Sequence, residues 1–289
     1  MADRRFQEHN LEIDTAIFKL ASTGKVFDLS SGWWPGMPLA PGHPPFQVLT
    51  FRTPMGEKNQ KDLEFFGENQ SNFRFISELL SFCAHSGTHI DALSHITLGE
   101  KNEWFGGYSA DDYLGDFGPL NNDASTLPPY ITRGVLLDVP GALGVDRLNI
   151  SQRIDSSLIK KTLNYQEIDL KIGDTILIRT GMMANWPDVS KMDETTGSGI
   201  DLDAAEFLSK YKPALIGADT PVVELMPSGV IGEPQPVHRL LIHDLGIPLM
   251  EWVYLEELAG AKAYEFLFIS LPIPIKGATG SLIRPIALC

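Results

Sequence analysis

The sequence is poor in cysteine, in basic residues and in long apolar segments, and each shortage argues against a class of protein. Only two cysteines occur in 289 residues, so a disulfide framework is not indicated and the cytoplasm is the expected compartment. The 23 basic residues against 37 acidic ones leave a net charge of −14, which argues against nucleic acid or an anionic membrane as partner. No apolar run is long enough to span a bilayer, and stretch 1–10 lacks the apolar core of a signal peptide.

Familiar catalytic motifs are missing as well. The chain has no Gly-x-Ser-x-Gly nucleophile elbow and no glycine-rich phosphate loop ahead of a Lys-Ser/Thr pair. Cys83 could suggest a thiol nucleophile, but its flank of Leu79, Leu80 and Phe82 favours an inert, buried thiol. These absences argue against serine-hydrolase, nucleotide-binding and thiol chemistry.

What is present predicts an α/β domain with a substantial core. Hydrophobic residues make up 43% of the chain. Strands are expected where short apolar runs are bounded by Gly, Pro or Asp, and helices where apolar residues recur at helical spacing. The expected strands are 26–29, 134–139, 173–181 (a turn, then a strand), 214–219, 247–251, 265–271 and 280–288, and the expected helices are 11–22, 150–163, 202–211 and 237–245. Because both types alternate along the chain and several strands are wholly apolar, we expect one sheet covered on both faces.

A short segment that begins at His85 packs three of the chain's seven histidines and one aspartate into eleven residues. His85 and His89 share a face on a helical turn, while His89 and Asp91 share a face on an extended segment, so a junction near Gly87 could aim all three at one point. Imidazole and carboxylate are the usual ligands of Zn²⁺ or Mn²⁺. We therefore expect a metal site there, with His95 left over as a proton carrier. The alternative is a polar loop whose histidines satisfy local hydrogen bonds.

Further candidates lie far from this segment. His238 opens an apolar helix, and Glu251 ends an apolar extended stretch, where a buried carboxylate needs a partner. That partner could be a metal or an ordinary hydrogen-bond donor, and residue type alone leaves both open. Asp219 and Arg179 stand near strand ends and are expected to cap loops, and His43 is expected to be a loop residue and not a ligand.

Aromatic residues flank the histidine-rich segment and could line an apolar pocket, although as single residues they could equally serve core or lid packing. They are Trp33, Trp34, Phe65, Phe66, Phe73 and Phe75. Together with the scarcity of basic residues, they predict a small, neutral, ring-containing substrate.

The segment His85-Ser-Gly-Thr-His89-Ile-Asp91-x-x-x-His95 resembles the signature His-x-Gly-Thr-His-x-Asp-x-Pro-x-His of the cyclase superfamily of metal-dependent hydrolases. That group includes bacterial kynurenine formamidases and isatin hydrolases. The resemblance covers roughly residues 25–289, so we place an N-terminal helical segment at 1–24 and a cyclase-like hydrolase domain at 25–289. Two departures are visible: a leucine replaces the proline of the signature, and no serine follows soon after Asp219.

The resemblance implies a swivelling β/β/α fold with Mn²⁺ or Zn²⁺ on His85, His89 and Asp91 and with His95 as acid and base. In the formamidase branch a second ion is held by Asp91 with residues that correspond to His238 and Glu251. Family members are usually homodimers or homotetramers in which aromatic residues of one subunit close the site of another.

The implied reaction is hydrolysis by metal-activated water. We expect cleavage of a C–N bond in a small cyclic amide or an aryl formamide. A lactone hydrolase of the same family and a metal-binding scaffold without turnover are the alternatives.

Overall fold

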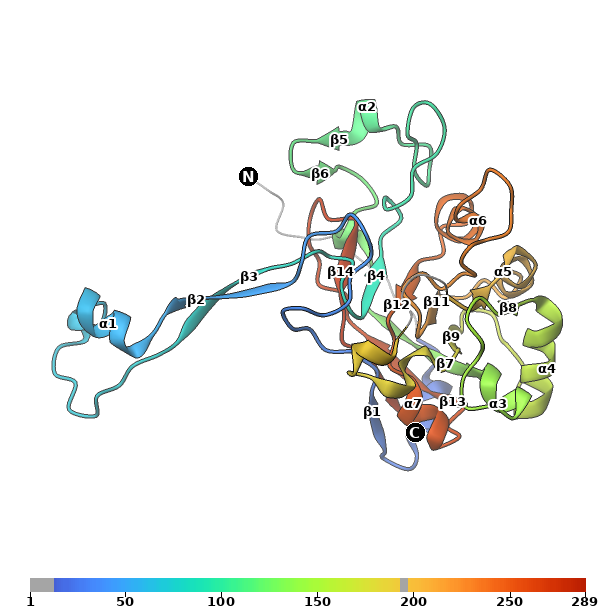
Figure 1. Cartoon of the computed structure of the whole chain (residues 1–289), viewed down its shortest axis with the longest axis horizontal. Coiled ribbons are helices and arrows are strands. Elements are labelled where there is room, and N and C mark those ends of the chain that lie inside the picture. The colour runs from blue at the N-terminus through green and yellow to red at the C-terminus, as the bar shows by residue number, and fades with distance from the viewer. Residues whose placement is uncertain (1–12, 193–196) are drawn as a thin grey trace.

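In the computed structural model, which describes residues 13–192 and 197–289, a nine-stranded mixed sheet forms the centre of the molecule (Figure 1). The strand order is β1 (Val26–Asp28), β15 (Ile286–Leu288), β13 (Glu265–Ser270), β7 (Tyr130–Asp138), β9 (Thr175–Arg179), β11 (Leu215–Ala218), β12 (Leu249–Glu251), β4 (His89–Asp91) and β14 (Gly280–Leu282). Strands β7, β9, β11 and β12 are parallel, and each pairing outside this group is antiparallel. The predicted α/β fold with a single main sheet is confirmed.

The sheet is covered on both faces, as the wholly apolar strands predict. Along β7, Val135 and Leu137 face one core and Leu136 faces the other. The first core is closed by α4 (Ser156–Gln166), α5 (Leu202–Ser209) and η6 (Arg239–Asp244), and the second by α7 (Glu256–Gly260) (Figure 1). Because both faces of the central strands pack against a hydrophobic core, these strands have no polar face.

Several observed elements differ from the predicted ones, most clearly at two places. The helix expected from residue 150 begins six residues later, at α4, where the Asp155 side chain accepts a hydrogen bond from the Leu158 amide at 2.8 Å, and β8 (Arg153–Ile154) precedes it. The single strand expected over 280–288 is split into β14 and β15, because Pro285 has no amide hydrogen to donate.

Several short elements connect the main ones. They are η1 (Thr15–Ala21), α2 (Ala110–Tyr113), β5 (Leu114–Gly115), β6 (Gly118–Pro119), η3 (Ala124–Thr126), α3 (Val139–Leu143), η4 (Met182–Asn185), η5 (Val189–Lys191), β10 (Gly199–Ile200) and α6 (Pro236–His238). Of the helix expected over 11–22, the structure describes the part after residue 12, where η1 packs against β13. Within the described ranges, no helix is long and apolar enough to cross a membrane.

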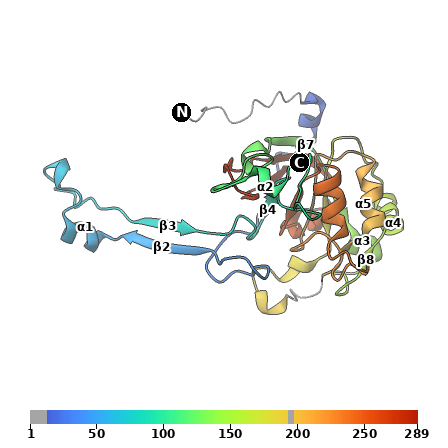
Figure 2. The same ribbon diagram turned by 90° about the horizontal axis from the view of Figure 1, so that it is seen from above.

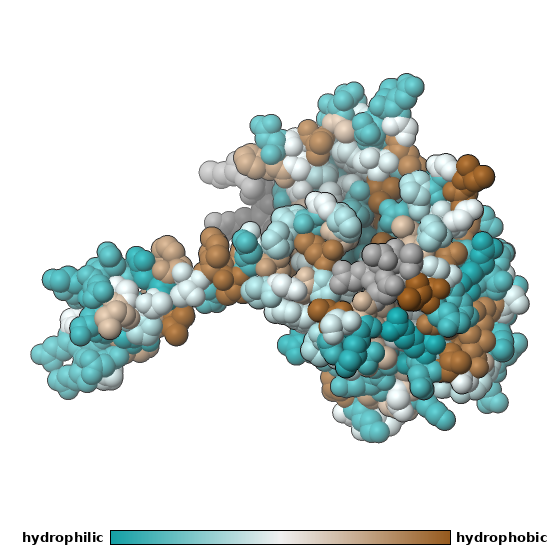
Figure 3. Space-filling view, in the orientation of Figure 1, coloured by the Kyte–Doolittle hydropathy of each residue, from teal (hydrophilic) through white to brown (hydrophobic). Residues whose placement is uncertain are grey.

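A long arm projects from this body, and the sequence does not predict it (Figures 1 and 2). Strands β2 (Gln47–Arg52) and β3 (Ser77–Ser81) pair in antiparallel fashion, and the chain between them forms α1 (Pro54–Gln60) and η2 (Glu64–Phe66). Large apolar side chains stay exposed along the arm, and several are visible as brown residues in Figure 3. They are Val48, Leu49, Phe51, Met55, Phe65, Phe66, Phe73, Phe75, Ile76, Leu79 and Leu80.

Candidate metal centre

The histidine-rich segment enters the sheet at β4, which lies between β12 and β14. His89 and Asp91 point to the same side of this buried strand, as the period of two predicts. The register of β12 places Glu251 directly opposite His89. One strand pairing therefore joins residues that are about 160 positions apart in the sequence.

The approach to β4 is a tight turn built around two glycines. Gly87 has a positive φ of 56°, and a β-carbon there would lie 2.7 Å from Met37 Cε and 2.9 Å from Trp33 Nε1. Gly280 of β14 packs under His85, whose Cε1 would be 2.6 Å from an added β-carbon. The predicted junction exists, and its first histidine stands on a turn and not on a helix.

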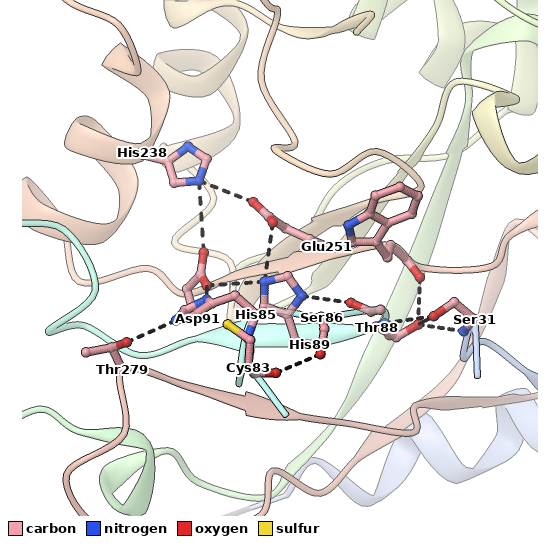
Figure 4. Close-up of polar contacts among 12 residues, drawn as sticks. Ser31, Cys83, His85, Ser86, Thr88, His89, Asp91, His238, Glu251 and Thr279 are labelled. Carbon is pink, nitrogen blue, oxygen red and sulfur yellow. Dashed lines mark hydrogen bonds and ion pairs between the residues drawn. The ribbon is translucent and has the colours of Figure 1, made fainter. Parts of the chain in front are cut away.

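Five buried side chains converge at this point (Figure 4). Asp91 Oδ1 lies 2.8 Å from His85 Nδ1 and 3.6 Å from His89 Nε2. Glu251 lies 3.3 Å from His89 Nε2 through Oε2 and 3.3 Å from His238 Nε2 through Oε1. Asp91 Oδ2 is 3.9 Å from His238 Nε2. The structure thus forms two possible ligand sets, one of His85, His89 and Asp91 and one of Asp91, His238 and Glu251, each with ligand atoms within 4.8 Å of one another.

Contacts behind the imidazoles fix their orientation. His89 Nδ1 lies 2.8 Å from the Gly87 carbonyl oxygen, which can only accept, so Nδ1 carries the hydrogen and Nε2 faces the carboxylates. His238 Nδ1 donates to the Glu224 carboxylate in the same way. His85 Nε2 lies 3.0 Å from the Thr279 hydroxyl, with Nδ1 turned to Asp91. Each ring therefore has one nitrogen tethered and the other aimed at the centre.

This arrangement fits a divalent cation. His89 Nε2 and Asp91 Oδ2 are buried and have no hydrogen-bond partner among the described residues. Burial opposes protonation of His89 and His238, yet the neighbouring carboxylates outweigh it and raise the pKa of each to about 10. Burial also opposes the charge on Asp91, but His95 and His85 hold its pKa well below the usual value. The carboxylates demand positive charge, which a metal ion supplies.

His95 lies beside this centre as the predicted proton carrier would. Its ring stacks on that of His85, with centroids 4.0 Å apart and planes at 25°. Burial lowers the pKa of His95 to about 4. The Asp91 carboxylate acts to raise this pKa, but His85 and His238 partly cancel its attraction. The ring is therefore neutral near pH 7.

The structure brings only some of the predicted aromatic residues to the centre. Trp33 donates from Nε1 to the Ser86 carbonyl at 2.8 Å, and Trp34 packs beside Trp186 with centroids 5.1 Å apart. Phe65 and Phe66 belong instead to η2 on the arm and are 76% and 65% exposed. The β2–β3 ribbon carries them away from the body (Figure 2), and their place in a substrate pocket stays a prediction. Phe73 and Phe75 are exposed on the same arm.

Other predicted roles can now be compared with the structure. Asp219 caps a loop, accepting from the amides of Thr180 at 2.9 Å and Gly181 at 2.8 Å. Arg179 pairs with Asp138 and with the α7 residue Glu256, so it serves the fold.

Three contacts of the centre escape the sequence analysis. His43 does lie in a loop, but its ring stacks on His85 with centroids 5.4 Å apart. Glu224 and Thr279 orient His238 and His85. Glu224 follows Val222-Val223, so its apolar flank carries the same signal of a buried carboxylate as Glu251. Thr279 and His43 offer no such signal.

Comparisons with known proteins identify the family of the chain and proteins of similar fold. The model of the Cyclase family matches residues 27–225. A kynurenine formamidase from Geobacillus thermodenitrificans (strain NG80-2) is 27% identical over 205 residues, which span 71% of this chain and 76% of that protein. A crystal structure described as a novel cyclase is 27% identical, with a TM-score of 0.82 and coverage of 95% of this chain and 90% of that one. Isatin hydrolase A from Ralstonia solanacearum shares the fold, with a TM-score of 0.67 and 17% identity. The match covers 97% of this chain and 98% of that one.

Proposed function

Because the chain belongs to the Cyclase family, whose model it matches over more than half its length, we propose that it is a metal-dependent hydrolase that cleaves a C–N bond in a small cyclic amide or an aryl formamide. The observation that carries the proposal is the set of five converging buried side chains, with His89 Nε2 and Asp91 Oδ2 left without hydrogen-bond partners among the described residues. Buried polar atoms of this kind cost free energy unless a ligand satisfies them.

The residues divide into holders of the ion and a carrier of the proton. His85, His89 and Asp91 would hold one Mn²⁺ or Zn²⁺ ion, and His238 and Glu251 would hold a second one with Asp91. When bound, such an ion supplies polarisation of the substrate carbonyl and lowers the pKa of water towards neutrality.

His95 would take the proton that the attacking water loses and pass it to the leaving nitrogen. The C–O bond forms first and the C–N bond then breaks, and the products are a carboxylate, an amine and one released proton. Acid–base catalysis of this kind contributes about 10²–10⁴-fold.

The substrate is proposed to be small and uncharged. Among the ion pairs of the described residues, those of Asp91 and Glu251 involve only histidines, and the chain as a whole has few basic residues to pair with an anionic substrate. Trp33 donates to the Ser86 carbonyl beside the centre, and with Trp34 it packs against the apolar cluster of Met37, Phe46 and Leu282, so the two rings are proposed to bind a flat substrate.

A substrate panel with Mn²⁺ and Zn²⁺ tests the proposal. N-formylkynurenine, isatin, simple lactams and lactones would be assayed side by side for formate release and for acid production. We expect turnover of an amide that depends on added metal. A preference above about tenfold in kcat/KM, roughly 1.4 kcal/mol, for an anionic or phosphorylated substrate would refute the neutral-ring assignment. Turnover of lactones alone would assign an ester hydrolase, and metal binding without turnover a scaffold.

We also propose that a second copy of this chain covers the arm, giving a homodimer or homotetramer. An isolated two-stranded ribbon is marginally stable in water, and exposed apolar patches of this size mark interaction surfaces. A partner's body would bury the aromatic side chains of the arm, and those side chains would reach the partner's metal centre.

Complementation tests this assembly. A Phe65→Ser/Phe66→Ser variant and a His95→Gln variant would each lose activity alone, and mixing them should restore part of it if arms cross between copies. Sedimentation of the wild type should show a dimer or a larger species. A wild type that is monomeric at micromolar concentration and fully active would contradict the proposal.

A further inference from the structure

Glu224 lies outside the predicted ligand sets, yet its surroundings hold it in one place. Glu224 is only 1% exposed. The segment that carries it pairs with Ile200 of β10, and Gly199 packs so closely against its backbone that no side chain would fit there. The preceding residue, Val223, has a φ of 51°, which is strained for a β-branched residue. The fold thus accepts a backbone strain directly beside a buried carboxylate.

Both carboxylate oxygens of Glu224 are occupied by donors from one short helix, α6. Oε2 accepts from the Val237 amide at 3.1 Å, and Oε1 accepts from the His238 amide at 3.1 Å and from His238 Nδ1. Three donors therefore hold the backbone and the ring of His238 at once. Since a carboxylate can only accept, Nδ1 carries a hydrogen, and Nε2 is directed at Asp91 and Glu251.

We infer that Glu224 is a positioning residue for the second set of candidate ligands, which orients His238 so that Nε2 can bind a divalent cation together with Asp91 and Glu251. The inference rests on the proposed function. The ring nitrogens of His89 and His85 that face away from the centre contact the uncharged groups of Gly87 and Thr279, whereas the corresponding nitrogen of His238 contacts a carboxylate. Loss of Glu224 should therefore weaken the second ion and spare the first.

The carboxylate also adds to the charge that the centre must balance. Asp91, Glu251 and Glu224 are three buried acidic groups, and the ion pairs of the described residues give them only histidine partners.

The test compares Glu224→Gln with Glu57→Gln as a matched control. Glu57 is also 1% exposed and accepts one backbone hydrogen bond, from the Phe75 amide at 3.1 Å, but it belongs to the arm. Metal would first be removed from the full-length protein, and Mn²⁺ would then be titrated in. Bound ions would be counted after dialysis. Electron paramagnetic resonance then distinguishes a coupled pair of Mn²⁺ ions from an isolated one, a signature that a change of stability alone does not move.

We expect two Mn²⁺ ions per chain and a coupled spectrum for the wild type and for Glu57→Gln. Glu224→Gln should weaken the second ion about 10–100-fold and give the isolated spectrum, with the first ion retained. His238→Ala sets the limit for complete loss of the second ion. If Glu224→Gln does not fold, Glu224→Asp, which keeps the charge on a shorter side chain, should show the same change to a smaller degree.

The outcomes separate the inference from the proposed function. A wild type that binds no divalent ion overturns the proposed function. A wild type with two ions and a Glu224→Gln variant that keeps both, with affinities within about threefold, overturns the inference alone. Retention of every bound ion by His238→Ala also overturns it, because His238 then holds no ion.

Discussion

The metal centre and the arm adjoin each other in the sequence and are built in opposite ways. The centre on β4 is buried and polar, and its donors converge on atoms without a partner among the described residues. The arm is exposed and rich in apolar side chains that find little to pack against in their own chain. Among the described residues, the centre thus leaves buried polar atoms without hydrogen-bond partners, and the arm leaves large apolar side chains exposed.

The free energy at stake differs between the two regions, and so does the kind of binding partner that would supply it. A buried polar group without a partner costs about 1–3 kcal/mol, and a charged one more, so the centre is expected to bind its ion tightly. Each aromatic side chain on the arm gains about 1.5–3 kcal/mol when it is buried, which a second protein surface can supply. The four changes below should separate the centre from the arm, and they run from the largest expected effect to the smallest.

Asp91→Asn should have the largest effect, because Asp91 belongs to both candidate ligand sets. We expect loss of both ions and a fall in kcat/KM of about 10⁴-fold or more, equivalent to about 5 kcal/mol. Metal analysis and steady-state kinetics measure it. Asp219→Asn serves as the control, since Asp219 is buried but caps a loop outside the centre, and it should lower stability and keep the metal. Unchanged metal content in Asp91→Asn would show that Asp91 does not hold the ions, and it would contradict the description of this region as a metal centre.

How far the sequence predicts this centre depends on the distance between the partners. His89 and Asp91 share a face because they are two residues apart on a strand, so their convergence follows from local geometry alone. Glu251 meets His89 through the register of β12 and β4, which no local pattern specifies. The resemblance to a known family groups Glu251 with Asp91 and His238, whereas its contact with His89 was not predicted.

The arm shows the opposite limit. Val48, Leu49 and Phe51 have the composition of a core strand, yet all three are exposed. Hydrophobicity reports that a surface is to be buried, and it cannot say whether the same chain or another one buries it. For this reason residue type suggests a pocket for the aromatic residues of the arm, but it does not predict that they lie on a projecting ribbon.

His95→Gln should have the next largest effect, on catalysis and not on metal binding. The ring of His95 stacks on that of His85 and is not part of either ligand set. We expect the metal content to stay near the wild-type value and kcat to fall about 10²–10³-fold. A variant that loses its metal and regains full turnover when the metal is resupplied would show that His95 holds the ion.

Removal of the metal should destabilise the body and leave the arm unchanged. At a concentration of about 100 times Kd, a bound ion stabilises the folded state by about 2.7 kcal/mol. For a chain of this size we expect chelation to lower Tm by about 5–10 °C. Hydrogen exchange should increase around β4 and β12, with no change in β2 and β3. Equal changes in both regions would mean that the centre and the arm act as one unit.

The smallest expected effect concerns His43, which lies between the two regions. Its loop leads into β2, and its ring stacks on the outer face of His85 with the planes at 22°. A stacked pair of rings contributes about 0.5–1.5 kcal/mol, so His43→Ala should weaken the first ion about 2–10-fold. His43→Phe keeps a flat ring but no nitrogen and should restore the affinity. Calorimetric titration with Zn²⁺ measures all three proteins. If His43→Phe is as weak as His43→Ala, a ring nitrogen and not the stack supports His85, and if neither differs from the wild type, the base of the arm and the centre are independent.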